Sequence, residues 1–145
     1  MTVLVLHGPN LNLLGTRQPE VYGKQTLSEL DDLIKTAAAN LGIDVRCEQY
    51  NAEGDIIDAL HGARGQYDGV VINPGAYAHY SYAIADAIAS IGIPVVEVHL
   101  SNLAAREEFR RISVTAAACR GSIAGFGAPS YVLALHALRD LQEKR

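Results

Sequence analysis

Hydrophobic and polar positions follow two alternating patterns along the chain. Short runs of apolar, often β-branched residues are typical of buried strands, and longer segments with apolar residues at every third or fourth position are typical of amphipathic helices. The short runs predict strands at Thr2–His7, Asp44–Tyr50, Gly69–Asn73, Val95–His99 and, with the weakest pattern, Arg120–Ala124. The periodic segments predict helices at Thr26–Leu41, Glu53–Ala63, Ser81–Ile91, Ala104–Ile112 and Ser130–Lys144.

Capping residues fix several of these boundaries. Thr26 and Glu29 have the spacing of a capping box, and Asn51 and Ser81 precede two further helices as candidate N-caps. Gly42 follows the first long helix as a stop signal. The last helix is predicted to bury a stripe that contains Val132, Leu135, Leu138 and Leu141.

The alternation of strands and helices predicts a parallel sheet with helices on both faces. Five strands in 145 residues fit one α/β domain over residues 1–145, a flavodoxin-like doubly wound sheet of order 2-1-3-4-5. In that order Cys47 and Cys119 lie near opposite edges of the sheet, so a disulfide between them is excluded and both are expected to be core thiols.

Composition narrows the class of protein. The net charge is −4, with 12 basic and 16 acidic residues and no basic run, which argues against a nucleic-acid partner. No apolar run is long enough to span a membrane, and the N-terminus does not resemble a signal peptide. With two separated cysteines, a reducing cytoplasmic setting is expected.

Candidate chemistry gathers where three predicted strands end. Polar or backbone-exposing residues follow the first strand, in the Gly8–Asn12 segment, the third, in Asn73–His79, and the fourth, in His99–Asn102. In a doubly wound sheet these carboxyl ends form the ligand-binding crevice. Any one segment could be a set of turn residues or helix caps, but three adjacent strand ends of this kind favour a site.

The connection after the first strand is unusually long. Gly8–Gln25 runs for roughly 18 residues, expected without secondary structure, where two to six is usual. It carries Arg17 and Tyr22 between Gly15 and Gly23, which could act as hinges of a lid. It has no phosphate-loop pattern, so a nucleotide is not indicated.

Glu97 and His99 stand two residues apart on one strand, so their side chains face the same way. A neighbouring carboxylate fixes the tautomer of an imidazole and favours its protonated form, which makes it a better proton donor. The alternative is a structural ion pair. His7, His61 and His136 have no such partner in the pattern and are interpreted as structural, and no His, Cys or Asp spacing resembles a metal site.

Asp86 is predicted to lie on the outer side of its helix, away from the face formed by Ile84, Ala87, Ile88 and Ile91. A solvated charge is the common reading of such a residue. Tyr82, Ala85 and Ala89 beside it are unusually apolar for a solvated face, which favours a subunit interface instead.

The chain resembles the type II 3-dehydroquinate dehydratases from its first strand to its last helix. The matching segments are Gly8-Pro9-Asn10-Leu11-Asn12-Leu13-Leu14-Gly15, Arg17 to Gly23, Gln49 with Asn51, Glu53 and Gly54, Asn73-Pro74-Gly75-Ala76 with His79, Asp86-Ala87, and Glu97 to Asn102 with Arg106 to Arg110. The chain departs from the usual family pattern at Tyr50, Ala52, Ala78 and Ala104, none of which has an expected catalytic role.

The resemblance implies reversible anti elimination of water from 3-dehydroquinate through an enolate to give 3-dehydroshikimate, a step of the shikimate pathway towards chorismate and the aromatic amino acids. It assigns Tyr22 as the proton acceptor and His99, oriented by Glu97, as the proton donor. Because a free phenol has a pKa of about 10, the base needs a cation, which Arg17 would supply. Asn10 would hold a water at the enolate oxygen. The expected substrate ligands are Asn73, His79, Leu100, Ser101, Arg110 and an Asp86 from a neighbouring subunit.

The resemblance also implies a homododecamer, a tetramer of trimers, that needs no cofactor. The unrelated type I enzymes form a Schiff base on a lysine, and none of Lys24, Lys35 and Lys144 has the pattern of a buried amine. The rival class is a flavodoxin-like binding or regulatory module that has lost catalysis. That module would lack the acid or the base, whereas Tyr22 and His99 are both present.

Overall fold

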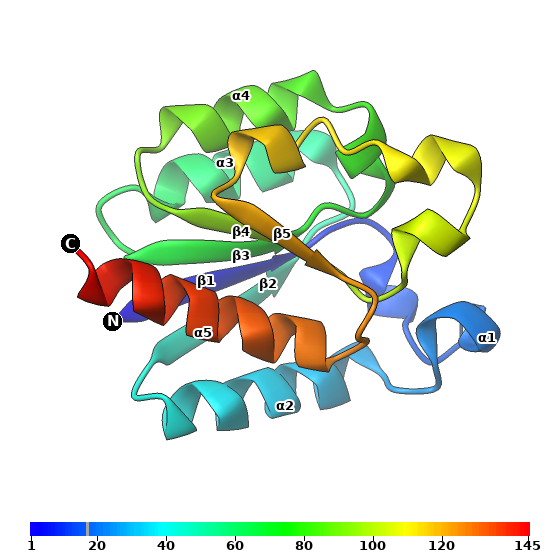
Figure 1. Cartoon of the computed structure of the whole chain (residues 1–145), viewed down its shortest axis with the longest axis horizontal. Helices are drawn as coiled ribbons and strands as arrows, with labels where there is room; N and C mark the ends of the chain where they lie inside the picture. The colour runs from blue at the N-terminus through cyan, green and yellow to red at the C-terminus, as the bar shows by residue number, and fades with distance from the viewer. Residues whose placement is uncertain (17) are drawn as a thin grey trace.

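The computed structural model describes residues 1–16 and 18–145 and has the predicted sheet. Five parallel strands pair in the order β2-β1-β3-β4-β5, which confirms the doubly wound fold (Figure 1). The strands are β1 (Thr2–His7), β2 (Asp44–Gln49), β3 (Gly69–Asn73), β4 (Val95–His99) and β5 (Gly121–Ala124).

Helices cover both faces of this sheet. The helices are α1 (Pro19–Tyr22), α2 (Leu27–Asn40), α3 (Glu53–Ala63), α4 (Tyr82–Ser90) and α5 (Pro129–Glu143). In Figure 1, α3 and α4 lie above the sheet and α2 and α5 below it. Alternate residues of the central strands therefore enter two separate apolar cores, such as Val5 and Val71 on the α2–α5 side and Leu6 and Ile72 on the other.

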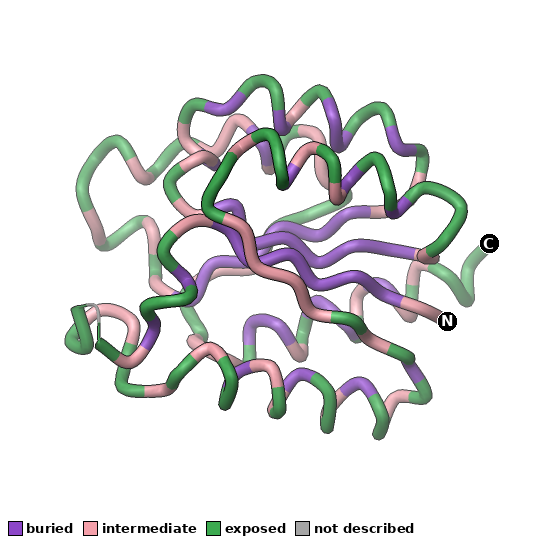
Figure 2. The backbone as a smooth tube through the Cα atoms, turned by 180° about the vertical axis from the view of Figure 1, so that it is seen from behind, coloured by how far each residue is buried: buried purple, intermediate pink, exposed green. Residues whose placement is uncertain are grey.

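Burial is concentrated in the three inner strands. Every residue of β3 and β4 is buried, whereas the edge strands β2 and β5 have none (Figure 2). Removal of this apolar surface from water is the main favourable contribution to folding. The buried inner strands β1, β3 and β4 end at His7, Asn73 and His99, so these three residues are fixed in position by the packed core.

Two predicted helix caps are confirmed and one is wrong. The Thr26 hydroxyl accepts from the Glu29 N–H, and the Ser81 hydroxyl accepts from the Ile84 N–H. Asn51 does not cap α3, whose N-cap is Ala52 without a side-chain bond. The Asn51 side chain instead accepts the backbone N–H of Asn10, and so ties the loop after β1 to the end of β2.

The loop after β1 has more structure than expected. It contains a 3-10 turn at Leu11–Leu13 and the short helix α1. Gly8 lies so close to β3 that an added Cβ would come within 2.7 Å of the Asn73 carbonyl oxygen, the same atom that accepts the Gly8 N–H. A side chain at this position would force the two strand ends apart.

The predicted helix Ala104–Ile112 is wrong. The segment forms two 3-10 turns, Leu103–Ala105 and Glu108–Arg111, separated by extended backbone at Arg106. A continuous helix would continue the helical turns through Arg106 and direct its side chain along the helix surface. The extended backbone instead lets that side chain reach Tyr22 and Ser101.

The inner face of α5 also differs from the prediction. Its buried residues include Tyr131, Ala134, Leu135 and Leu138, whereas Val132 and Leu141 are only half-buried. Both cysteines are free, as expected from their positions near opposite edges of the sheet, but they are half-buried and not fully within the core as predicted. Within residues 1–16 and 18–145, no helix is both long and apolar enough to cross a membrane.

Candidate active site

A polar cleft opens at the carboxyl ends of β1, β3 and β4. It brings together most of the residues predicted from the sequence: its lining includes Asn10, Tyr22, Asn73, His79, His99, Leu100, Ser101 and Arg110. Glu97 lies directly behind His99. Arg17 lies outside the described residues, and Asp86 lies elsewhere, on α4.

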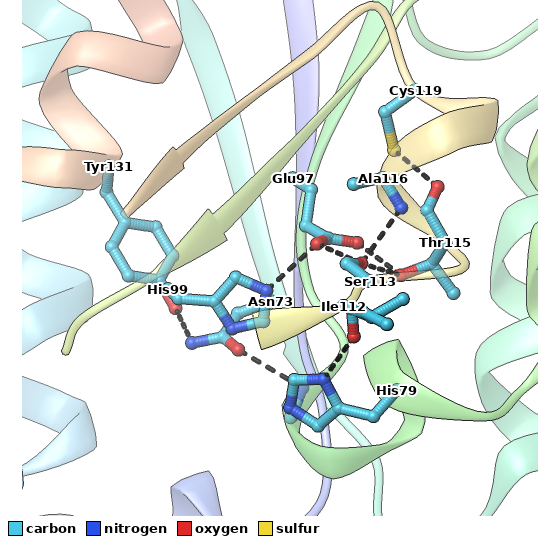
Figure 3. A network of polar contacts seen from close by, with 11 residues as sticks. Asn73, His79, Glu97, His99, Ile112, Ser113, Thr115, Ala116, Cys119 and Tyr131 are labelled. Carbon is cyan, nitrogen blue, oxygen red and sulfur yellow. Dashed lines mark hydrogen bonds and ion pairs between the residues drawn. The ribbon is translucent and has the colours of Figure 1, made fainter. Parts of the chain in front are cut away.

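A buried network of hydroxyl groups holds the Glu97–His99 pair (Figure 3). His99 Nε2 is 2.9 Å from a carboxylate oxygen of Glu97, and that carboxylate also accepts from the hydroxyls of Ser113, at 2.6 Å, and Thr115. Because Nε2 is bound to the carboxylate, Nδ1 is the ring nitrogen that can exchange a proton with a ligand. The predicted pairing of Glu97 with His99 is confirmed.

The same network keeps Glu97 ionised. Burial alone would raise the pKa of this carboxyl group, but the hydrogen bonds from His99, Ser113 and Thr115 together outweigh burial and hold the pKa below its ordinary value. Glu97 is 1 % exposed. A buried carboxylate of this kind stabilises a positive charge on the imidazole beside it.

Tyr22 enters the cleft from the loop after β1, where it is the last residue of α1. Its hydroxyl accepts a hydrogen bond from Arg106 Nη1 at 2.9 Å, and the guanidinium carbon lies 5.1 Å from the centre of the tyrosine ring. The same nitrogen is 3.3 Å from the Ser101 hydroxyl. Arg106 therefore places a permanent cation against the phenol oxygen.

The remaining polar groups of the cleft come from the segments at the ends of β3 and β4. His79 Nδ1 donates to the Ile112 carbonyl at 2.8 Å, which fixes the orientation of its ring, and the ring is stacked against His99 at 6.3 Å. Asn73 ends β3 and is 4 % exposed. The Arg110 guanidinium binds Glu107 at 2.6 Å, and Arg110 lines the cleft beside Arg106.

Asn10 is held in an unusual backbone conformation. Its φ is 69°, in the left-handed region, and its N–H is bound to Asn51 at 3.0 Å. Asparagine tolerates this region better than most residues, and here the conformation begins the 3-10 turn that forms one wall of the cleft. The loop thus directs Asn10 to the cleft without the support of a strand.

Asp86 is exposed on α4, as predicted, and does not line the cleft of its own chain. Tyr82 near it is 70 % exposed, and Tyr80 in the preceding turn is 60 % exposed. Large exposed aromatic side chains beside a charge are typical of interaction surfaces.

Several residues that shape the site were missed by the sequence interpretation. Arg106 belongs to a matching segment but received no role, and Ser113, Thr115 and Tyr131 were not identified at all. The expectation that His7 lacks a carboxylate partner is wrong, because Asp31 lies 2.7 Å from its Nε2. Each of these contacts joins residues distant in the sequence or in irregular segments, where periodicity carries no signal.

A second hollow does not have the chemistry of an active site. It lies between α2 and α5, has a volume of about 870 Å³ and is lined mainly by apolar residues such as Leu33, Phe126 and Leu133. The polar cleft is much narrower, at about 50 Å³, but it holds two histidines, a tyrosine and two arginines. Convergent titratable groups are better evidence of catalysis than volume.

Together, the doubly wound fold and a strand-end cleft with an imidazole–carboxylate pair and an arginine-bound phenol define a class: an α/β enzyme built for proton transfer on a small polar substrate. The family model "Dehydroquinase class II" matches residues 1–139, and the chain belongs to this family.

Individual relatives agree with this assignment. The chain is 55 % identical over 141 residues to a 3-dehydroquinate dehydratase of Caldanaerobacter subterraneus subsp. tengcongensis, covering 97 % of this chain and 95 % of the relative. It is 57 % identical over 138 residues to one of Bacillus cytotoxicus, covering 95 % and 94 %. The crystal structure of a type II dehydroquinase from Butyrivibrio crossotus superposes with a TM-score of 0.94 at 48 % identity, covering 96 % of this chain and 97 % of that one.

Proposed function

We propose that this chain is a 3-dehydroquinate dehydratase of the shikimate pathway, acting through an enolate and without a Schiff base. The observation that carries the proposal is that one cleft contains both a cation-bound phenol, Tyr22, and a carboxylate-bound imidazole, His99. An elimination beside a ketone needs one group to remove a proton and another to supply one. The reaction is an anti elimination, reversible, with 3-dehydroshikimate as product.

In the first step, Tyr22 as phenolate removes a proton from the carbon beside the ketone, and the electrons of the C–H bond move onto the ketone oxygen to form the enolate. Arg106 stabilises the phenolate from 2.9 Å, and Arg17 in the same loop segment adds a second positive charge. Asn10 holds a water against the enolate oxygen. The negative charge that develops there is the part of the reaction that needs hydrogen-bond donors most.

In the second step, the enolate collapses, the bond to the hydroxyl at the next carbon breaks, and His99 protonates the departing oxygen so that it leaves as water. The new double bond is conjugated with the restored ketone. Glu97 holds the imidazole by Nε2, so Nδ1 delivers the proton, and the carboxylate stabilises the charged ring before the transfer. Tyr22 then releases its proton to solvent and His99 takes one up, which restores both groups for the next turnover.

The substrate is an anionic hydroxy acid, and the cleft offers matched groups. Asn73, His79 and Arg110 bind its hydroxyls, and the backbone at Leu100 with the Ser101 hydroxyl binds its carboxylate. Arg106 and Arg110 lie 12 % and 16 % exposed by side chain, so their charge is concentrated at the cleft although the whole chain has a net charge of −4. Local cations therefore attract the substrate to an acidic protein.

The assembly we propose is a homododecamer, a tetramer of trimers, in which Asp86 reaches the cleft of a neighbouring subunit. The exposed position of Asp86 beside Tyr82 supports this arrangement. Mixing two inactive variants, Tyr22→Phe and Asp86→Ala, under subunit exchange tests it. If each site combines its own Tyr22 with a neighbour's Asp86, random mixing restores about a quarter of the sites. Unchanged inactivity after proven exchange would contradict the shared site.

The activity itself is tested by adding purified protein to 3-dehydroquinate and recording the ultraviolet absorbance of the conjugated enone. We expect turnover without added metal or cofactor, because Tyr22 and His99 cover both proton transfers. Borohydride added together with substrate should leave activity intact, since the reaction forms no imine on a lysine. Absence of absorbance at micromolar enzyme would refute the function, and inactivation by borohydride would refute the mechanism. A cytoplasmic location is proposed with it, in keeping with the two free cysteines.

A further inference from the structure

A row of hydrogen bonds runs from the surface of α2 through the core to the cleft. Asp31 on α2 lies 2.7 Å from His7 Nε2, and His7 Nδ1 lies 3.1 Å from the Tyr131 hydroxyl on α5. The Asn73 side-chain nitrogen donates to the same hydroxyl at 3.1 Å (Figure 3). His7 and Asn73 are register partners at the ends of β1 and β3, so the row joins two strand ends to both helices of one face.

The direction of each hydrogen bond in this row can be determined from its cleft end. The Asn73 side-chain oxygen accepts the N–H of Gly75 at 3.2 Å, so its nitrogen is the atom that faces Tyr131 and donates. The Tyr131 oxygen is thereby an acceptor, and its own proton goes to His7 Nδ1. His7 then carries its proton on Nε2 and donates it to Asp31.

We propose that Asp31, His7 and Tyr131 are positioning residues that fix the side-chain amide of Asn73 for substrate binding, an inference that rests on the proposed role of Asn73 as a substrate ligand. Tyr131 is completely buried and His7 is 1 % exposed, so water does not replace a missing partner at either group. With both ends of the amide bound, Asn73 presents one N–H and one oxygen lone pair to the cleft in a single orientation. A substrate hydroxyl can use both, because it donates and accepts.

The Asp31 end of this row also has residues that could bind a metal ion. His7, Asp31 and Cys47 offer ligand atoms that lie within 4.8 Å of one another. A metal on His7 Nε2 would move the ring proton to Nδ1, so that His7 and Asn73 would both donate to Tyr131 and the buried Tyr131 proton would lose its acceptor. Burial, together with the charge of Asp31, also raises the pKa of the Cys47 thiol to about 12, which disfavours a thiolate ligand. The hydrogen-bond directions therefore favour the positioning row.

Tyr131→Phe tests the row by removing only the hydroxyl while keeping the ring. We expect the KM for 3-dehydroquinate to rise about tenfold with kcat changed less than about threefold, because loss of a binding contact that is equal in ground and transition states changes KM. Tyr50→Phe is the matched control, since it removes a hydroxyl whose hydrogen bond among the described residues goes to Glu48 and not to the row. Its KM should equal that of the unmodified protein.

The decisive comparison uses the double variant Asn73→Ala with Tyr131→Phe. If Tyr131 acts through Asn73, removal of its hydroxyl has no further effect on KM once the amide is gone. Independent, multiplying effects would overturn the positioning role. If Asn73→Ala alone leaves KM unchanged, the substrate role of Asn73 is refuted instead, and the positioning role with it, so the two failures are distinguishable.

A pair of variants at the surface end covers the case in which Tyr131→Phe does not fold. Asp31→Ala removes the acceptor of the His7 proton, and Asp31→Asn keeps an acceptor oxygen at the same place. We expect about a threefold rise in KM for the alanine variant and recovery in the asparagine variant. Equal KM values in Asp31→Ala and the unmodified protein would overturn the proposal.

Discussion

His99 ends a strand in which every residue is buried, whereas Tyr22 ends a four-residue helix that has no buried residue. The two walls of one cleft are thus built in different ways. The His99 wall depends on the sheet and on a network of hydroxyls around Glu97. The Tyr22 wall depends on the loop after β1 and on contacts such as the hydrogen bond from Arg106.

This difference separates catalysis from stability. On the strand side a polar group serves both functions, because removing it leaves buried partners unsatisfied. On the loop side a side chain can be changed with little effect on the core. Loops on a rigid scaffold commonly carry function for this reason, and they can also open and close over a substrate.

Tyr22→Phe should cause the largest loss of activity and the smallest loss of stability. We expect kcat to fall about a thousandfold, since general base catalysis contributes about 10²- to 10⁴-fold. The melting temperature should stay within about 1 °C, because α1 has no buried residue and the phenyl ring is kept. Steady-state kinetics and thermal unfolding check both values. Tyr67→Phe, at the other end of the sheet, is the control and should retain full activity.

His99→Gln should lower both the activity and the stability of the protein. We expect kcat to fall about a hundredfold through loss of the proton donor. Stability should fall by about 1–2 kcal/mol, because a neutral, flexible amide replaces the imidazole that binds the buried Glu97 carboxylate, while the hydroxyl partners of Glu97 remain. Steady-state kinetics measure the fall in kcat, and denaturant unfolding measures the fall in stability. A variant as stable as the unmodified protein would remove the distinction drawn between the two walls.

Arg106→Met should lower activity less strongly than the two preceding variants, with little change in stability. Methionine keeps much of the apolar side chain but removes the cation beside the Tyr22 hydroxyl, and we expect kcat to fall about tenfold at neutral pH. Arg139→Met, on α5 and outside the cleft lining, is the control. Equal turnover numbers for Arg106→Met and the unmodified protein would contradict a role of this cation beside Tyr22.

The smallest effect is a pH dependence of stability. The pKa of Glu97 is lowered from its ordinary value of 4.5 in the folded protein. The contribution of ionised Glu97 to the free energy of unfolding is therefore complete above about pH 4.5. It is lost as the pH falls through the lower pKa of the folded protein. Unfolding free energies measured from pH 6 downwards should show this loss, and Glu97→Gln should reduce the slope. Glu108→Gln, at an exposed position, should not change it.

The sequence pattern predicted what depends on local order. Apolar runs located the strands, Thr26 and Ser81 located helix starts, and the strand ends located the cleft. Two residues on one strand, Glu97 and His99, could be paired from their spacing alone.

Contacts between distant segments could not be predicted in this way. Arg106 meets Tyr22 across 84 positions, and Asn73 meets Tyr131 across 58. The Arg106 contact depends on the extended backbone that separates two 3-10 turns at this residue. The hydrophobic pattern of the segment predicts a continuous helix and gives no sign of that interruption. The Tyr131 contact needs the registry of α5 on the sheet, which is set by packing and shifted its inner face from the predicted stripe.

The division of labour between the two walls is tested most directly by solvent exchange of the substrate proton. Incubating 3-dehydroquinate in deuterium oxide with each variant separates removal of that proton from loss of water. The account predicts that His99→Gln exchanges the proton beside the ketone while forming little enone, because Tyr22 still makes the enolate. Tyr22→Phe should neither exchange the proton nor form enone. Exchange catalysed by Tyr22→Phe at the rate of the unmodified protein would contradict the assignment of Tyr22 as the base.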